Sequence, residues 1–185
     1  MAIIKTTLPI HSLLNDSTKN YDYMDSFRGE LIDEKQSIEP IDVVKAFFST
    51  APSWVSYLMV LRNKIVAVFG LKTTNNSRLS PQEQLSNFKG EPNEQLGLFK
   101  VFSKTNNEII MGEDDKHLNF RVSLYLEPSK NEAFKKDLII TTAVKFNNWL
   151  GKLYFLPVKP LHQLIVPTML KAIIKQLNST VKNVN

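Results

Sequence analysis

Apolar and polar residues alternate in several parts of this 185-residue chain, most clearly over 118–126. There Leu118, Val122 and Leu126 belong to an apolar row that takes in every second residue, and polar side chains stand between them. Because successive side chains of a strand point to opposite faces, this run predicts a strand with one buried face. Less regular runs predict further strands over 20–31, 98–104, 108–113 and 138–146.

Two short helices are predicted after the first strand, where proline is placed in a first helical turn. Pro40 opens a helix that ends near Phe48, and Pro52 opens a second helix that ends at Gly70. The second helix carries apolar residues at helical spacing, namely Trp54, Leu58, Leu61, Ile65 and Val68.

A polar stretch over 72–96 separates these helices from the later strands. Within it Ser80 is followed three positions later by Glu83, which is the pattern of a capping box and predicts a helix near 81–88. Loops of this length rarely lack structure of their own, so we expect a partly ordered insert or a lid.

The segment 149–177 predicts one long amphipathic helix. Its apolar stripe consists of Val158, Leu161, Ile165, Val166, Met169 and Ile173. Its solvent-facing row consists of Lys159, Gln163, Pro167, Lys171 and Lys175. Pro157 and Pro160 are expected to break or kink the start of the helix, since proline removes a backbone hydrogen bond.

This order of elements predicts an α+β fold in which a curved antiparallel sheet wraps around the long C-terminal helix. Residues 1–19 are expected to form a loosely packed tail, and 179–185 a second tail. The residues between them, 20–178, are expected to form a single domain in which 72–96 is an insert. A ligand cavity is expected in the gap between sheet and helix.

Several short motifs carry a resemblance to a known family. They are 22–27 (DYMDSF), 51–55 (APSWV), 61–63 (LRN), 112–122 (GEDDKHLNFRV), 151–155 (GKLYF) and 159–162 (KPLH). Together they resemble the bacterial domain-of-unknown-function family numbered 2867, and the order of elements is similar to the helix-grip, polyketide cyclase-like fold of the START/Bet v 1-like superfamily. The family pattern usually has an acid where this chain has Asn119, so a carboxylate that would pair with Arg121 is missing. The resemblance implies a fold that holds apolar ligands between sheet and helix, without an established activity.

Composition narrows the chemistry. The chain has no cysteine, which excludes disulfides, thiol nucleophiles and cysteine-ligated metal sites. It also lacks a Gly-rich phosphate loop and a Gly-x-Ser-x-Gly motif, and its three histidines are far apart in the sequence. We therefore predict no cofactor and no metal. The first residues lack the pattern of a signal peptide, so a cytoplasmic location is expected.

The net charge of +5 arises in the C-terminal segment. None of the 18 acidic residues follows Asp137, whereas six lysines do: Lys145, Lys152, Lys159, Lys171, Lys175 and Lys182. Nucleic-acid binding proteins favour clustered arginines, so we predict a solvated lysine face and no nucleic-acid partner. Binding to a membrane surface is a minor alternative, and the charged and proline interruptions argue against a transmembrane segment.

A candidate polar site contains Glu113, Asp115 and His117. At this spacing an extended chain would place all three on one face, where they could bind a metal or transfer a proton. The segment is also expected to contain a hairpin turn, and it shares its parity with Arg121, opposite the apolar row. A turn stabilised by ion pairs is the preferred interpretation, with Arg121 in an ion pair on the sheet.

His162 lies on the apolar stripe of the last helix and should face the sheet. A hydrogen-bonded core histidine is the favoured interpretation, since a buried polar group needs a partner. Contact with the polar end of a ligand and general-base catalysis are the functional alternatives. Tyr154 and Arg121 are its candidate companions, and Asp25 is expected either in the cavity or at a sheet edge.

The favoured hypothesis is therefore the binding of a small apolar molecule between the sheet and the C-terminal helix. The residues expected to line the cavity are Val122, Leu124, Val144, Phe146, Ile165 and Met169, with His162 at the polar end. The alternatives are a cyclase- or dehydratase-like enzyme that uses His162 with a nearby acid in the same cavity, and a protein-interaction module. No catalytic residue is assigned, and the sequence does not indicate the ligand, the oligomeric state or the role of 72–96.

Overall fold

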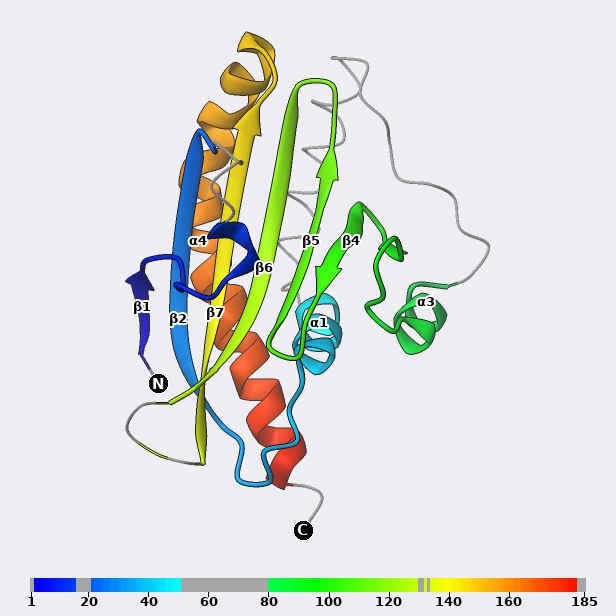
Figure 1. The fold of residues 1–185 in the computed structure, drawn as a ribbon, viewed down its shortest axis with the longest axis vertical. Helices are drawn as coiled ribbons and strands as arrows, with labels where there is room; N and C mark the ends of the chain where they lie inside the picture. The colour runs from blue at the N-terminus through cyan, green and yellow to red at the C-terminus, as the bar shows by residue number, and fades with distance from the viewer. Residues whose placement is uncertain (1, 16–20, 51–79, 130–131, 133, 183–185) are drawn as a thin grey trace.

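A computed structural model shows an antiparallel sheet with a long helix packed across one of its faces (Figure 1). It describes residues 2–15, 21–50, 80–129, 132 and 134–182. Within these residues the sheet has seven strands, in the order β1-β2-β7-β6-β5-β4-β3. The α+β class and the sheet-and-helix arrangement are confirmed, and they are consistent with a helix-grip fold.

The strands predicted from alternation are all present. They correspond to β2 (Tyr23–Ile32), β4 (Phe99–Lys104), β5 (Glu108–Asp114), β6 (Leu118–Pro128) and β7 (Lys135–Phe146). The sheet also contains two short strands that were not predicted, β1 (Ile3–Thr6) and β3 (Gln95–Leu96). The longest pairings join β7 to β2 on one side and to β6 on the other, so β7 lies in the middle of the best-paired part of the sheet.

The N-terminal segment differs from the expected loose tail. Its strand β1 pairs antiparallel with β2, with Ile3 opposite Gly29. Further along, Ser12 and the 3-10 turn η1 (Leu13–Asn15) lie over the sheet face opposite the long helix, where Leu14 packs with Ile110. A four-residue strand at a sheet edge has too short an alternation to be recognised in the sequence.

The described helices begin close to their predicted positions. The helices are α1 (Pro40–Ser49), α3 (Pro81–Asn87) and α4 (Trp149–Lys182). In α3 the Ser80 hydroxyl accepts a hydrogen bond from the Glu83 N–H, and the Glu83 carboxylate accepts one from the Ser80 N–H. This reciprocal pair confirms the predicted capping box. The second predicted helix, over 52–70, lies outside the described residues, as does most of the stretch over 72–79.

The long helix α4 is continuous, so the expected break at Pro157 and Pro160 is not present. A proline at position i leaves the carbonyl of residue i−4 without its helical hydrogen bond. The three prolines inside α4 release the carbonyls of Leu153, Leu156 and Gln163, which belong to exposed residues that water can reach. The helix therefore tolerates them, and it also extends to Lys182, into the expected C-terminal tail.

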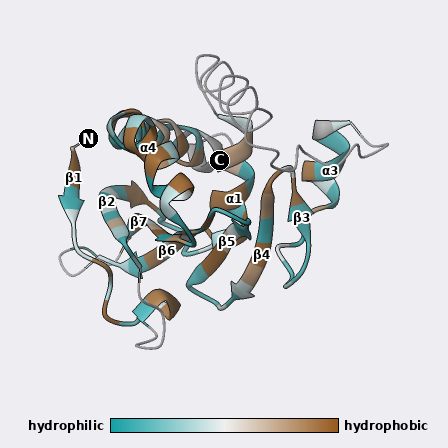
Figure 2. Cartoon of the chain, turned by 90° about the horizontal axis from the view of Figure 1, so that it is seen from above, coloured by the Kyte–Doolittle hydropathy of each residue, from teal (hydrophilic) through white to brown (hydrophobic). Residues whose placement is uncertain are grey.

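The hydrophobic core lies between the sheet and the two helices α4 and α1, which cover the same side of the curved sheet (Figure 2). Helix α4 approaches the sheet closely at Gly29 on β2, where an added Cβ would lie 2.6 Å from the Ile174 side chain. Fully buried residues of this core include Leu31, Val44, Leu124, Leu138, Leu170, Ile173 and Ile174.

Candidate functional site

A buried polar cluster lies beneath the N-terminal half of α4. Strand alternation places Asp25 of β2 on the same face as the core residues Phe27 and Leu31, and the register sets Asp25 directly opposite Thr142 of β7. From α4, His162 reaches down to both: its Nδ1 lies 3.4 Å from Asp25 Oδ2, and its Nε2 lies 3.1 Å from Thr142 Oγ1. Together with Tyr23 these residues form what we call the Asp25–His162 cluster.

Tyr23 completes the cluster as a hydrogen-bond donor. Its hydroxyl donates to Asp25 Oδ2 at 2.5 Å, and Gln163 Nε2 donates to the Tyr23 oxygen at 3.5 Å. Burial, the hydrogen bond to Asp25 and the charge of Asp25 together raise the pKa of Tyr23 well above its usual range. At neutral pH Tyr23 is therefore a neutral phenol that keeps its proton.

Aromatic rings and one lysine enclose the cluster on its helix side. The Tyr23 ring packs against Phe155, with ring centroids 4.8 Å apart, and meets the imidazole of His162 edge-on. The ammonium of Lys159 lies 5.4 Å from the centre of the Tyr23 ring. These contacts fix the orientation of Tyr23 and bring a positive charge close to the edge of the cluster.

The cluster is incomplete in its hydrogen bonding. Within the described part of the chain, Asp25 Oδ1 and His162 Nδ1 are buried atoms without a hydrogen-bond partner. The Asp25 side chain is 1% exposed and the His162 side chain 18% exposed, so the cluster is closed on the strand side and partly open on the helix side. A buried polar atom left unpaired costs about 1–3 kcal/mol, and native proteins contain few of them.

The order Asp25–His162–Thr142 is that of an acid, a base and a hydroxyl, but it does not favour nucleophilic catalysis. Thr142 is 5% exposed and lies in mid-strand, with β2 paired on one side of β7 and β6 on the other. Its neighbouring backbone N–H groups are thus engaged in the sheet and cannot form an oxyanion hole. The geometry suits hydrogen-bonded recognition or proton transfer better than acyl transfer.

The expectation that Glu113, Asp115 and His117 share one outward face is wrong. Glu113 pairs with Phe120, which places it on the core side of the sheet, whereas Asp115 lies in the hairpin turn. The turn breaks the alternation on which the expectation depended. His117 is buried, with its Nδ1 3.1 Å from Asn148 Oδ1. Among the described residues, no group of three His, Asp or Glu side chains could hold a metal ion.

Arg121 lies on the face of the sheet away from α4, as its predicted ion-pairing role requires. Its guanidinium forms an ion pair with Asp114 at 2.7 Å and stacks over the Phe102 ring at 3.5 Å. Because the Asp25–His162 cluster is on the other face, Arg121 is not a companion of His162.

The expected lining residues are all on the core side, with different degrees of burial. Val122, Leu124, Val144 and Met169 are buried, whereas Phe146 and Ile165 are half-buried. Val122 and Leu124 pack in the core cluster that also contains Leu170 and Ile173. Their role in lining a ligand cavity stays a prediction.

Sequence reasoning located His162 but did not assign its partners. In the sequence, Asp25 stands out only as an acid on an apolar row, and Tyr23 and Thr142 are indistinguishable from ordinary strand residues. The available signal was the run Tyr23-x-Asp25 on the buried row of β2, since an acid in such a row must be paired from another element.

The structure thus defines an α+β protein in which a buried acid, histidine and tyrosine lie between a curved sheet and its C-terminal helix. A family model described as "Protein of unknown function (DUF2867)" matches residues 17–169, and the chain belongs to this family. The matched span contains every member of the Asp25–His162 cluster. Comparisons with curated proteins and with solved structures found no match.

None of the helices in the described ranges has a stretch long and apolar enough to cross a membrane.

Proposed function

We propose that this protein binds a small molecule with an apolar body and one polar end, held between the sheet and α4 with its polar end at the Asp25–His162 cluster. The observation that carries the proposal is that, among the described residues, the buried atoms Asp25 Oδ1 and His162 Nδ1 lack a hydrogen-bond partner. A ligand hydroxyl or amine placed beside them would donate a hydrogen bond to the Asp25 oxygen, and this bond would compensate for the cost of burying that oxygen away from water.

The surrounding residues support the apolar part of this ligand. Phe155, Val144 and Phe146 lie on the core side next to the cluster, and the polar groups are few and converge on one point. Pockets for small molecules commonly combine apolar walls with a few such groups. The likeness to the START/Bet v 1-like superfamily points in the same direction. Bacterial origin and a cytoplasmic location remain predictions from the sequence.

The test is a ligand search on gently purified protein. Native mass spectrometry should detect a bound small molecule, and fatty acids, sterols or aromatic alcohols should raise the melting temperature of the wild type. In His162→Ala and Asp25→Asn the shift should shrink to a small fraction of its wild-type size, because both variants change the atoms that meet the polar end. His11→Ala, at an exposed histidine outside the cluster, is the matched control and should respond as the wild type does. Equal shifts in all four proteins would refute the assignment.

A second candidate function is acid–base catalysis in the same site, as in a cyclase or dehydratase. The observation that favours it is the 3.4 Å approach of Asp25 Oδ2 to His162 Nδ1, which suits a carboxylate that orients an imidazole for proton transfer. Tyr23, held neutral, would serve as the complementary donor. Once a ligand is found, turnover separates the two functions: an enzyme converts the ligand and loses that turnover in Asp25→Asn, whereas a binding protein has no turnover to lose.

A further inference from the structure

The outward side of α4 carries a row of large apolar side chains that the described structure leaves uncovered. Trp149 is 70% exposed, Leu153 50%, Leu156 63% and Leu164 67%. Their spacing of four, three and eight positions places them on one side of the helix, opposite His162. We call this row the outer apolar face. Leu161, which was expected in the buried stripe, is also 39% exposed, so the first half of α4 is apolar on both sides.

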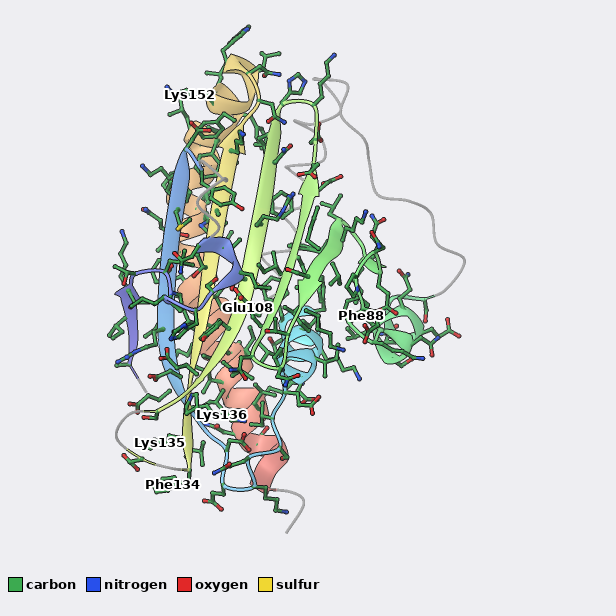
Figure 3. The ribbon with its side chains drawn as sticks, viewed as in Figure 1. Phe88, Glu108, Phe134, Lys135, Lys136 and Lys152 are labelled. Carbon is green, nitrogen blue, oxygen red and sulfur yellow. The ribbon has the colours of Figure 1, made fainter. Side chains whose placement is uncertain are left out.

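The charges around the outer apolar face are positive. Lys152 and Lys159 lie along one flank, and Lys171 and Lys175 continue the exposed side of the helix toward its C-terminus. Figure 3 shows Lys152 at the end of the molecule where α4 begins. No acidic residue follows Asp137 in the sequence, so this helix carries no negative side chain that would offset these lysines.

Three acids on other elements lie near the start of α4, namely Asp22, Asp114 and Asp115, whose backbone carbonyl accepts a hydrogen bond from Asn147. The Asp22 carboxylate accepts a hydrogen bond from the Phe146 N–H, and Asp114 forms its ion pair with Arg121. The field at the outer apolar face is thus set mainly by the lysines of α4.

We propose that the outer apolar face of α4 docks on the surface of a membrane that contains anionic phospholipids. A helix that exposes tryptophan and leucine beside lysines matches the boundary between acyl chains and negatively charged headgroups. The apolar side chains would enter this boundary, and each lysine near the surface would add attraction to the anionic lipids. The proposal does not depend on the Asp25–His162 cluster, which lies on the other side of the helix.

A second copy of the chain fits this face less well. A two-fold contact through the outer apolar face would bring the lysines that flank it in one copy toward those in the other, without acids on α4 to compensate. An anionic surface is complementary to the same lysines.

The test is co-sedimentation of the whole protein with vesicles. Vesicles of phosphatidylcholine with about 30% phosphatidylserine should bind at least about five-fold more protein than pure phosphatidylcholine vesicles. That excess should largely disappear when the salt concentration is raised from about 0.05 M to about 0.5 M, since salt screens surface charges. Absence of binding, or equal binding to both vesicle types, would overturn the proposal.

Variants assign the contact to this face. The triple variant Leu153→Gln, Leu156→Gln, Leu164→Gln should reduce the bound fraction about five-fold or more, while its melting temperature stays close to wild type because the positions are exposed. Ile10→Gln, which changes a side chain that is 85% exposed on the N-terminal segment, is the matched control and should bind as wild type. Undiminished binding by the triple variant, or a dimer in sedimentation velocity that the triple variant abolishes, would overturn the assignment.

Fluorescence gives a second readout that does not require the triple variant to fold. Anionic vesicles should shift the tryptophan emission of the wild type to shorter wavelength, because Trp149 leaves water for the lipid boundary. In Trp149→Phe this shift should be lost. A shift that persists in this variant would overturn the docking geometry.

Discussion

The phenol of Tyr23 donates a 2.5 Å hydrogen bond to the carboxylate of Asp25, two positions further along the same strand. Burial of the ring and the adjacent carboxylate raise the pKa of Tyr23 well above its usual range. A tyrosine in the unfolded chain loses its proton near pH 10, whereas Tyr23 in the folded protein still holds its proton at about that pH. Above about pH 10 the unfolded state therefore binds fewer protons, and the free energy of unfolding falls as pH rises.

We therefore predict that Tyr23→Phe is less stable than wild type at about pH 8 and that this difference shrinks above about pH 10. The contribution of Tyr23 is fully present below the pKa of the unfolded chain and is lost as pH rises toward the pKa of the folded state. Denaturant unfolding of both proteins across this range is the measurement. Lysine titration affects both proteins alike, so it cancels in the difference. A difference that stays constant with pH would contradict the prediction.

The connection from β2 to α1 depends on one buried carboxylate. Asp33 is 1% exposed, accepts hydrogen bonds from the N–H groups of Ser37 and Ile38, and forms a 2.7 Å ion pair with Lys136. Asp33→Ala removes the charge partner of the Lys136 ammonium and the acceptor of the Ser37 and Ile38 N–H groups, the second of which is buried. We expect a loss of about 3–5 kcal/mol in the free energy of unfolding, measured by urea denaturation.

The neighbouring lysine provides a matched comparison, and both lysines are labelled in Figure 3. Lys135 pairs with Glu132 and Glu30, whose side chains are exposed, whereas Lys136 pairs with the buried Asp33. Lys135→Met should leave the unfolding midpoint nearly unchanged, and Lys136→Met should lower it clearly, because only the second leaves a buried charge unpaired. Equal effects of the two substitutions would argue against a special role for Asp33.

The regular elements of this fold could be predicted from the sequence because their patterns are local. Alternation located β6, and the pairing of Ser80 with Glu83 located the start of α3. The single amphipathic stripe predicted for α4 describes only part of the helix, because its first half also carries exposed apolar residues on the outer side.

The polar sites could not be predicted, because they depend on contacts between distant segments. Asp25 and His162 meet only through the packing of α4 on β2, and the partners of Glu108 come from the N-terminal segment and from β6. The Glu113–His117 segment shows the limit of short-range spacing, because the predicted hairpin turn interrupts the face that its residues would share. Spacing in the sequence indicates a shared face only while the strand is unbroken.

The N-terminal segment is held to the sheet by Glu108, a carboxylate that is 1% exposed (Figure 3). It accepts hydrogen bonds from the Ser12 hydroxyl at 2.6 Å, from the Leu13 N–H at 2.7 Å and from the Ser123 hydroxyl. Glu108→Ala removes all three at once, and we expect a loss of about 3 kcal/mol. Hydrogen exchange should then become faster at the amides of 12–15. Unchanged exchange there would show that the segment is held by its apolar contacts alone.

The junction between β7 and α4 leaves no room for a side chain at Gly151. An added Cβ would lie 2.0 Å from the backbone carbonyl oxygen of His117, which cannot move aside as the end of a flexible side chain could. Gly151→Ala must therefore displace the start of α4 from the β5–β6 hairpin, and we expect a loss of at least about 2 kcal/mol, measured by thermal and urea unfolding. Gly97→Ala is the comparison, since an added Cβ there meets nothing within 4 Å and only the positive φ of 59° opposes it, at a cost of about 1 kcal/mol. A Gly151→Ala protein that is no less stable than Gly97→Ala would show that the helix start adjusts freely. The hairpin would then have no part in positioning α4 over the Asp25–His162 cluster.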